Sequence, residues 1–143
     1  MITRERLNLE KKVFQDQHLP SNTYVFKDMA TSKPYVLMAA RTNSGRVYTI
    51  RIDLDEFPNS VPKAFITRML KTKTGEDMDG ASGSMHTLTS EYGYTRICHY
   101  APSAWTPNVS LLKVYIKCRL WLEMYELHLK NGKPMDYYLS HQS

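Results

Sequence analysis

The segment from Gly93 to Pro107 contains the side chain best suited to covalent chemistry, the thiol of Cys98. Pro102 and Pro107 each remove a backbone donor and fix φ, so we expect an ordered but irregular loop. A cysteine on such a loop is held in place and remains reachable. A thiolate can form a thioester, which stores an activated carboxyl group for attack by an amine. We therefore interpret Cys98 as a covalent acyl carrier; a structural thiol and a redox sensor are the alternatives.

Histidines near Cys98 are the candidate groups to assist this thiol. His99 follows Cys98 directly, and His86 precedes it in the same half of the chain. Neighbouring side chains on an extended strand point to opposite sides, so His99 would face away from the sulfur. We favour His86, as support for an oxyanion or for the loop, and keep His99 as the second candidate. A histidine that only braces the loop is an equal alternative for His86.

The setting of the two cysteines, Cys98 and Cys118, argues against two other kinds of chemistry. A dithiol redox site would need a Cys-x-x-Cys pair, which the sequence lacks. A zinc site would need a cluster of cysteine and histidine at ligand spacing, which is also missing. The sequence therefore predicts no metal site and no cofactor.

A long helix predicted from Ser110 to about Lys130 gives Cys118 a different role. Apolar side chains recur at alternating steps of four and three, which is the period of one helix face. They are Leu111, Tyr115, Cys118, Leu122, Tyr125 and Leu129. Ser110 is a good N-cap, and Gly132 can end the helix in the left-handed conformation. Cys118 is therefore predicted to be a core residue.

The first half of the chain predicts a helix followed by strands. Thr3 can cap a helix over residues 2–18, and residues 42–45 have the composition of a hairpin turn. Strand-like runs occupy residues 24–29, 35–41, 46–54 and 64–70. In the third run the even-numbered residues from Tyr48 to Leu54 are expected to face the core. The predicted fold is α+β: an N-terminal helix, an antiparallel four-stranded meander, an active-site loop and a long C-terminal helix.

Residues 71–84 are expected to be the most flexible part of the chain. The segment contains three glycines and offers almost no large side chain for burial. We therefore interpret it as a poorly ordered loop.

Length and charge limit the classes of function. The 143 residues suit a single domain, 1–143, which can bury a core without a disulfide or metal. The net charge of +5 comes from scattered Lys and Arg, so nucleic-acid binding is not expected and docking of an acidic protein explains the charge equally well. No apolar run reaches the roughly 20 residues of a membrane span, and no leader segment is recognisable. The expectation is a cytoplasmic protein with reduced thiols.

Several motifs together resemble those of the ubiquitin-conjugating enzymes. The run from Phe57 to Pro62 stands in place of the family's FPxxYP, and Trp105-Thr106-Pro107 leads into the next helix. His86 corresponds to the histidine of the HPN tripeptide with which the family's active-site stretch begins. In the family this histidine lies seven residues before a glycine, and Gly93 follows His86 at the same distance. The resemblance extends from the first helix to the long helix. It implies a ubiquitin-conjugating-like fold with Cys98 as the thioester-forming catalytic residue.

The sequence departs from the family pattern close to the cysteine. Thr87 and Leu88 stand where the family has proline and the asparagine credited with supporting the oxyanion or the loop. The family's glycine lies three residues before the cysteine, whereas Gly93 lies five before Cys98. Tyr100 replaces the usual acidic residue. The resemblance then implies that His86, His99 or backbone amides support the oxyanion.

The tail from Trp121 to Pro134 is similar to the bacterial branch of the family, in the antiphage cyclic-oligonucleotide signalling (CBASS) operons. That resemblance implies antiviral defence, in which the C-terminus of a cGAS-like nucleotidyltransferase or a ubiquitin-like protein is carried on Cys98 and transferred to an amine or target protein. The cargo would come from a separate activating enzyme or without one. The alternative is a catalytically inactive relative that acts as a binding module.

Overall fold

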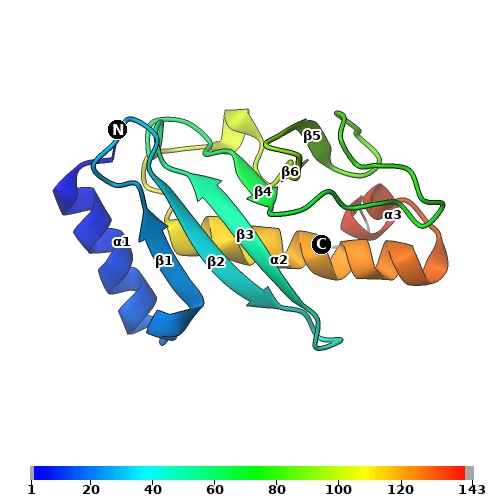
Figure 1. Cartoon of the computed structure of the whole chain (residues 1–143), viewed down its shortest axis with the longest axis horizontal. Coiled ribbons are helices and arrows are strands. Elements are labelled where there is room, and N and C mark those ends of the chain that lie inside the picture. The colour runs from blue at the N-terminus through cyan, green and yellow to red at the C-terminus, as the bar shows by residue number, and fades with distance from the viewer. Residues whose placement is uncertain (1, 141–143) are drawn as a thin grey trace.

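Six antiparallel strands form one sheet in the computed structural model, which describes residues 2–140 (Figure 1). They are β1 (Tyr24–Lys27), β2 (Tyr35–Arg41), β3 (Val47–Asp53), β4 (Ala64–Ile66), β5 (Thr87–Glu91) and β6 (Tyr94–Ile97). Their order across the sheet is β1-β2-β3-β4-β6-β5. The predicted α+β class is confirmed, as is the antiparallel meander of the first four strands. The predicted count of four strands is wrong, because β6 and β5 extend the sheet beyond β4.

Three α-helices accompany the sheet in the described residues: α1 (Arg4–Asp16), α2 (Leu111–Asn131) and α3 (Met135–Ser140). In Figure 1, α2 crosses behind the sheet, α1 lies beside β1, and α3 lies near the C-terminal end of α2. Two short 3-10 turns, Ser21–Thr23 and Pro102–Ala104, complete the regular structure. All four strands of the meander therefore lie before the Cys98 segment in the chain, and α2 follows it.

The face of the sheet that packs on the helices carries the alternating apolar side chains predicted for it. Tyr48, Ile50, Ile52 and Leu54 are all buried. Ile50 lies opposite Met38 on β2 and Ile66 on β4, so apolar side chains meet across three strands. Register across the sheet is thereby fixed by burial, since a shift of one residue would turn this face to solvent.

The predicted caps of α1 and α2 are confirmed. Thr3 Oγ1 accepts a hydrogen bond from the backbone N–H of Arg6 at 3.1 Å, and Ser110 Oγ accepts one from the backbone N–H of Lys113 at 3.1 Å. Gly132 ends α2 with φ of 78° and donates its N–H to the carbonyl of His128. These contacts satisfy backbone groups that the helix ends would leave unpaired.

A buried ion pair joins α1 to the start of α2. Arg6 Nε donates to Glu10 Oε2 at 2.8 Å, and Glu10 Oε1 accepts from the backbone N–H of Leu111 at 2.6 Å. Arg6 also donates to the carbonyl oxygens of Pro107 and Val109. We call Arg6 and Glu10 the N-terminal clasp; it fixes the chain where it enters α2.

A tight hairpin between β5 and β6 replaces part of the irregular loop predicted over residues 93–107. Tyr92 and Gly93 form its turn with φ of 61° and 73°, the left-handed values of a two-residue hairpin. Tyr94 to Ile97 is therefore a strand, and Cys98 is the first residue beyond it. The prediction of an irregular segment holds only after Ile97.

Residues 71–84, expected to form a poorly ordered loop with few groups to bury, make defined contacts with the rest of the fold. Lys71 and Asp77 pair as an isolated bridge, and Met78 is buried. The backbone N–H of Lys73 donates to His128 Nε2 at 3.0 Å, and the Tyr125 hydroxyl donates to the Lys71 carbonyl at 2.6 Å. Contacts with α2 therefore order the first half of this segment.

Helix α3 was not predicted, because its six residues are too few to show a helical period. Met135 is buried completely and anchors the helix on the core. The backbone N–H of Asp136 donates to the carbonyl of Ser84 at 2.7 Å. Helix α3 thus holds the segment that leads into β5.

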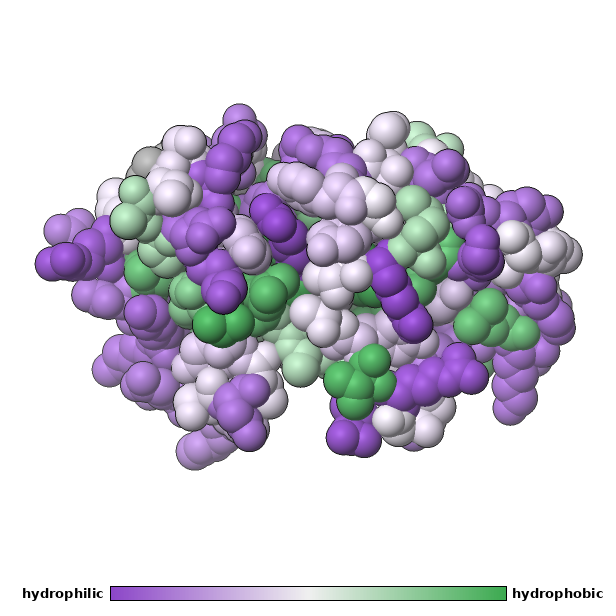
Figure 2. Space-filling model, viewed as in Figure 1, coloured by the Kyte–Doolittle hydropathy of each residue, from purple (hydrophilic) through white to green (hydrophobic). Residues whose placement is uncertain are grey.

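The face of the molecule shown in Figure 2 is mainly hydrophilic, with apolar side chains in separate groups. Among residues 2–140, none of the helices combines the length and apolar character needed to cross a membrane.

We predict that Cys118→Ser destabilises the fold by about 1–3 kcal/mol, because it buries a hydroxyl without a partner. Cys118 is 0% exposed, and burial raises the pKa of its thiol. Ile116→Ser is the matched control on the same helix, since Ile116 is 56% exposed, and should change stability by less than about 0.5 kcal/mol. Urea unfolding of both variants measures the difference, and equal losses would contradict the core assignment.

Candidate active site around Cys98

Cys98 lies directly after β6 and borders two separate hollows. Its backbone N–H donates to the carbonyl of His86 at 2.9 Å, which continues the pairing of β5 with β6. The residue is partly exposed and its thiol is free. One hollow has a volume of about 350 Å³ and the other about 170 Å³. The thiol is therefore fixed in position and can be approached from two sides.

His86 supports Cys98 through its backbone. Its φ of 51° is left-handed, a conformation that histidine adopts more readily than most residues. Its carbonyl accepts from the backbone N–H of Cys98 and from Trp121 Nε1 at 3.0 Å. The main chain of His86 therefore braces the Cys98 segment, and its ring takes no part in this contact.

The ring of His86 is oriented by α3. Its Nε2 lies 2.9 Å from Asp136 Oδ1, and a carboxylate oxygen only accepts, so Nε2 carries the proton. Nδ1 makes no hydrogen bond with any of residues 2–140. His86 and Cys98 both line the smaller hollow, together with His99, Lys117 and Trp121. An imidazole ring and a thiol-bearing residue thus share one opening.

His99 lines both hollows beside Cys98, so the expectation that it faces away from the sulfur is not confirmed. Its Nε2 donates to the carbonyl of Pro62 at 2.8 Å, which leaves Nδ1 as an acceptor. Nδ1 is buried and has no partner among the described residues. Burial lowers the pKa of His99, and the charges of Lys117 and Arg96 lower it further, against the opposing effect of the Pro62 bond. The ring is therefore neutral at neutral pH.

The larger hollow is lined mostly by apolar side chains, and we call it the apolar cleft. Besides Cys98 its wall contains Val61, Pro62, Leu88, Ile97, Tyr100 and Pro102. Leu88 occupies the position where the resembling family has asparagine, so no side-chain amide projects there. Candidate donors for an oxyanion are therefore backbone N–H groups and histidine.

Trp105 braces the segment after Cys98 as predicted. Its Nε1 donates to the carbonyl of Pro58 at 2.9 Å. Its ring meets Tyr100 edge-on at 5.3 Å between centroids and Phe57 at 6.1 Å. Lys117 Nζ lies 4.4 Å from the centroid of the Tyr100 ring. Aromatic contacts thus tie the Cys98 segment to the turn before β4 and to α2.

Sequence reasoning identified the thiol and both histidines but missed their partners. Asp136, which orients His86, lies in the helix that was not predicted. Trp121 was not connected with the site, although a buried indole N–H needs an acceptor and so signals a contact. The sequence gives no sign of the roles of Pro62 and Lys117, because their contacts with His99 and Tyr100 join residues far apart in the chain.

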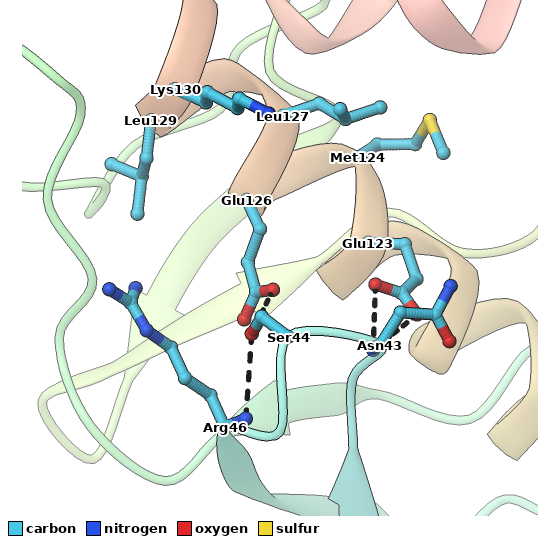
Figure 3. A pocket seen from close by; sticks show the side chains of 9 residues that line it. All are labelled: Asn43, Ser44, Arg46, Glu123, Met124, Glu126, Leu127, Leu129 and Lys130. Carbon is cyan, nitrogen blue, oxygen red and sulfur yellow. Dashed lines mark hydrogen bonds between the residues drawn. The ribbon is translucent and has the colours of Figure 1, made fainter.

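A further hollow of about 700 Å³ lies elsewhere, between the β2–β3 turn and the C-terminal half of α2 (Figure 3). Glu123 and Glu126 point into it toward Asn43 and Ser44, and Glu126 Oε1 accepts from the Ser44 hydroxyl at 2.7 Å. It shares no lining residue with the hollows around Cys98. Within residues 2–140, no three His, Cys, Asp or Glu side chains form a group that could hold a metal ion.

We predict that Trp105→Ala lowers the free energy of unfolding by about 3 kcal/mol, because it removes a half-buried ring and a hydrogen bond. Trp105→Phe keeps most ring contacts and loses only the Nε1 bond, so its cost should be about 0.5–1.5 kcal/mol. Chemical denaturation of the two variants gives these values. An unchanged melting temperature for Trp105→Ala would contradict the bracing role.

We predict that His99 makes the fold less stable in mild acid. Its folded-state pKa is lower than its usual value of 6.5, so below 6.5 the unfolded chain binds more protons than the folded chain. The free energy of unfolding should therefore be fully retained above pH 6.5 and fall as the pH drops toward the folded-state pKa. In His99→Gln this part of the loss should vanish. Urea titrations about one pH unit on each side of 6.5 test this, because the other histidines contribute equally to both proteins.

No protein-family model, curated protein or solved structure matches this chain.

Proposed function

We propose that this chain is a ubiquitin-conjugating-like enzyme that carries a protein C-terminus as a thioester on Cys98. The single observation that carries the proposal is the position of Cys98 between two openings, with its backbone fixed by the His86 carbonyl. A carrier needs one approach for the acyl chain and another for the attacking amine. The apolar cleft suits the acyl chain, and the smaller hollow with His86 suits the amine.

The order of elements supports a ubiquitin-conjugating-like fold. A helix, an antiparallel meander, the run from Phe57 to Pro62, the Cys98 segment, Trp105 and a long helix follow one another as the resemblance implies. The β5–β6 turn also accounts for one departure, because Gly93 is needed in the hairpin turn and not beside the cysteine. The resemblance remains the source of the family name.

The chemistry needs two balanced steps. In the first, Cys98 Sγ attacks the carbonyl carbon of a donor thioester, a C–S bond forms and the donor thiol leaves. In the second, an amine nitrogen attacks the same carbon, a C–N bond forms, and Cys98 leaves as a thiolate. The amine loses one proton, which His86 Nδ1 can accept because its lone pair is free. The proton then passes to the thiolate or to water.

The bacterial resemblance supplies the partners that we propose. The carried protein would be a cGAS-like nucleotidyltransferase or a ubiquitin-like protein with an exposed C-terminal tail, and the setting would be antiphage defence in the cytoplasm. A separate activating enzyme would form the first thioester, or the cargo would arrive in another activated form. The second candidate function, a catalytically inactive binding module, is favoured by Leu88, since it leaves the site without the family's asparagine.

We predict that a synthetic peptide with a C-terminal thioester acylates the wild-type protein once, at Cys98. Intact mass spectrometry should show an adduct that dithiothreitol removes. Cys98→Ala should form no adduct, whereas Cys118→Ser should form it normally. Cys98→Lys should convert it into an amide that resists dithiothreitol. An adduct that maps to Cys118 would contradict the assignment.

The rate at which the acylated protein transfers its peptide to an amine then distinguishes the two candidate functions. A conjugating enzyme should discharge the peptide to free lysine about 10²-fold faster than the same peptide is lost from N-acetylcysteine, because oxyanion support at the site accelerates aminolysis. A rate equal to that of N-acetylcysteine would reject the enzyme and favour the binding module.

A further inference from the structure

We propose that Lys117 is an internal acceptor: when no outside amine arrives, the acyl group on Cys98 passes to the ε-amine of Lys117 and forms a stable amide. The inference rests on the proposed acyl-carrier function and names a modification site within this chain. It predicts that a loaded protein without an acceptor modifies itself at one position. The amide then occupies the hollow through which an outside amine approaches.

Lys117 and Cys98 line the same small hollow. Lys117 belongs to the first half of α2, Cys98 follows β6, and both border the volume of about 170 Å³ together with Trp121. This is the hollow to which the proposed function assigns the attacking amine. A lysine of the chain itself therefore stands where an acceptor lysine has to come.

Two further observations place the ammonium group of Lys117 against the Cys98 segment. Its Nζ lies 4.4 Å from the centroid of the ring of Tyr100, two residues after Cys98. The pKa of His99, which burial lowers, is lowered further by the positive charge of Lys117, so this charge is also close to His99. The ammonium group thus lies beside the two residues that directly follow Cys98.

The amine of Lys117 is held only weakly. Among residues 2–140 it makes no hydrogen bond and no ion pair with a carboxylate, and its contact with Tyr100 is a cation–π contact. Such contacts are weak at partly exposed sites, and a lysine stem is a flexible chain of four carbons. Rotation about the bonds of this stem therefore suffices to bring Nζ from the Tyr100 ring to a carbonyl carbon attached to Cys98 Sγ.

Lys63 differs from Lys117 in the freedom of its amine. It lines the apolar cleft, the other hollow beside Cys98, but its Nζ is bound to Glu91 Oε2 at 2.9 Å. This hydrogen bond raises the pKa of the Lys63 amine, so a smaller fraction of it is neutral and nucleophilic. Of the two lysines that line these hollows, only Lys117 has no carboxylate partner among the described residues.

The transfer balances without a further reactant. The Lys117 ammonium group first loses one proton to water, and the neutral nitrogen attacks the carbonyl carbon of the thioester. A C–N bond forms, the C–S bond breaks, and a second proton passes from the nitrogen to the departing Cys98 thiolate. The products are an amide on Lys117, a free Cys98 thiol and one proton in solution.

The test loads the wild-type protein with a synthetic peptide thioester, removes the excess peptide by desalting and leaves the loaded protein without added amine. We expect the adduct that dithiothreitol removes to be replaced by one of equal mass that resists it. Peptide mapping by mass spectrometry should place the resistant adduct on Lys117. Its rate of formation should not depend on protein concentration, because both groups belong to one molecule.

Variants locate the reaction. Lys117→Arg keeps the positive charge but removes the amine, so the resistant adduct should form at least about 10-fold more slowly while the Cys98 thioester still forms. Lys117→Gln serves if Lys117→Arg does not fold. Lys113→Arg is the matched control one turn earlier on α2, since Lys113 is exposed and lines neither hollow, and it should behave as wild type. Cys98→Ala should gain no adduct on Lys117 from the same peptide thioester.

The outcomes separate this inference from the proposal on which it rests. A resistant adduct that maps to Lys63, spreads over several lysines or forms at the wild-type rate in Lys117→Arg would overturn the inference and leave the acyl carrier intact. A Cys98 thioester that only hydrolyses, with no amide formed, would do the same. Failure of the peptide to acylate a Cys98 that iodoacetamide still alkylates would overturn both.

Discussion

The carbonyl oxygen of His86 is the point on which the arrangement of the site depends. It accepts the backbone N–H of Cys98 and the indole N–H of Trp121, so one atom joins the start of β5, the end of β6 and the middle of α2. Trp121 is buried in the helix that fills the core. The Cys98 segment is therefore tied to the buried face of α2, and the left-handed φ of His86 turns this carbonyl toward both donors.

The two histidines beside the sulfur are similar in type but differ in what they can do. Each uses Nε2–H to bind an oxygen acceptor, Asp136 for His86 and the Pro62 carbonyl for His99. His99 is enclosed, and its lone pair lies within the protein. The His86 side chain is 31% exposed and lines the smaller hollow. The ring of His86 is therefore the more accessible of the two, and His99 is held as a fixed wall of the cleft.

How far sequence reasoning reached depends on whether the signal was local. Helix α2, its two caps and the burial of Cys118 follow from spacing within one segment, and all were predicted. The β5–β6 hairpin was missed because its turn places Tyr92 in a left-handed conformation, and tyrosine has no preference for that conformation. Helix α3 is too short to show a period. Cys98 and His86 were singled out by residue type, but the Asp136 contact joins residues 50 positions apart, and only the folded chain brings them together.

The N-terminal clasp makes the two ends of α2 differ in their response to ionic strength. The side chains of Arg6 and Glu10 are 18% and 4% exposed, so dissolved ions reach this pair poorly. Lys71 and Asp77, which close the turn that packs against the far end of α2, are 63% and 50% exposed and are screened readily. As salt rises, the attraction between Lys71 and Asp77 is therefore weakened before that between Arg6 and Glu10. The molecule thus has one salt-tolerant end and one salt-sensitive end, and the Cys98 segment is attached to the tolerant one.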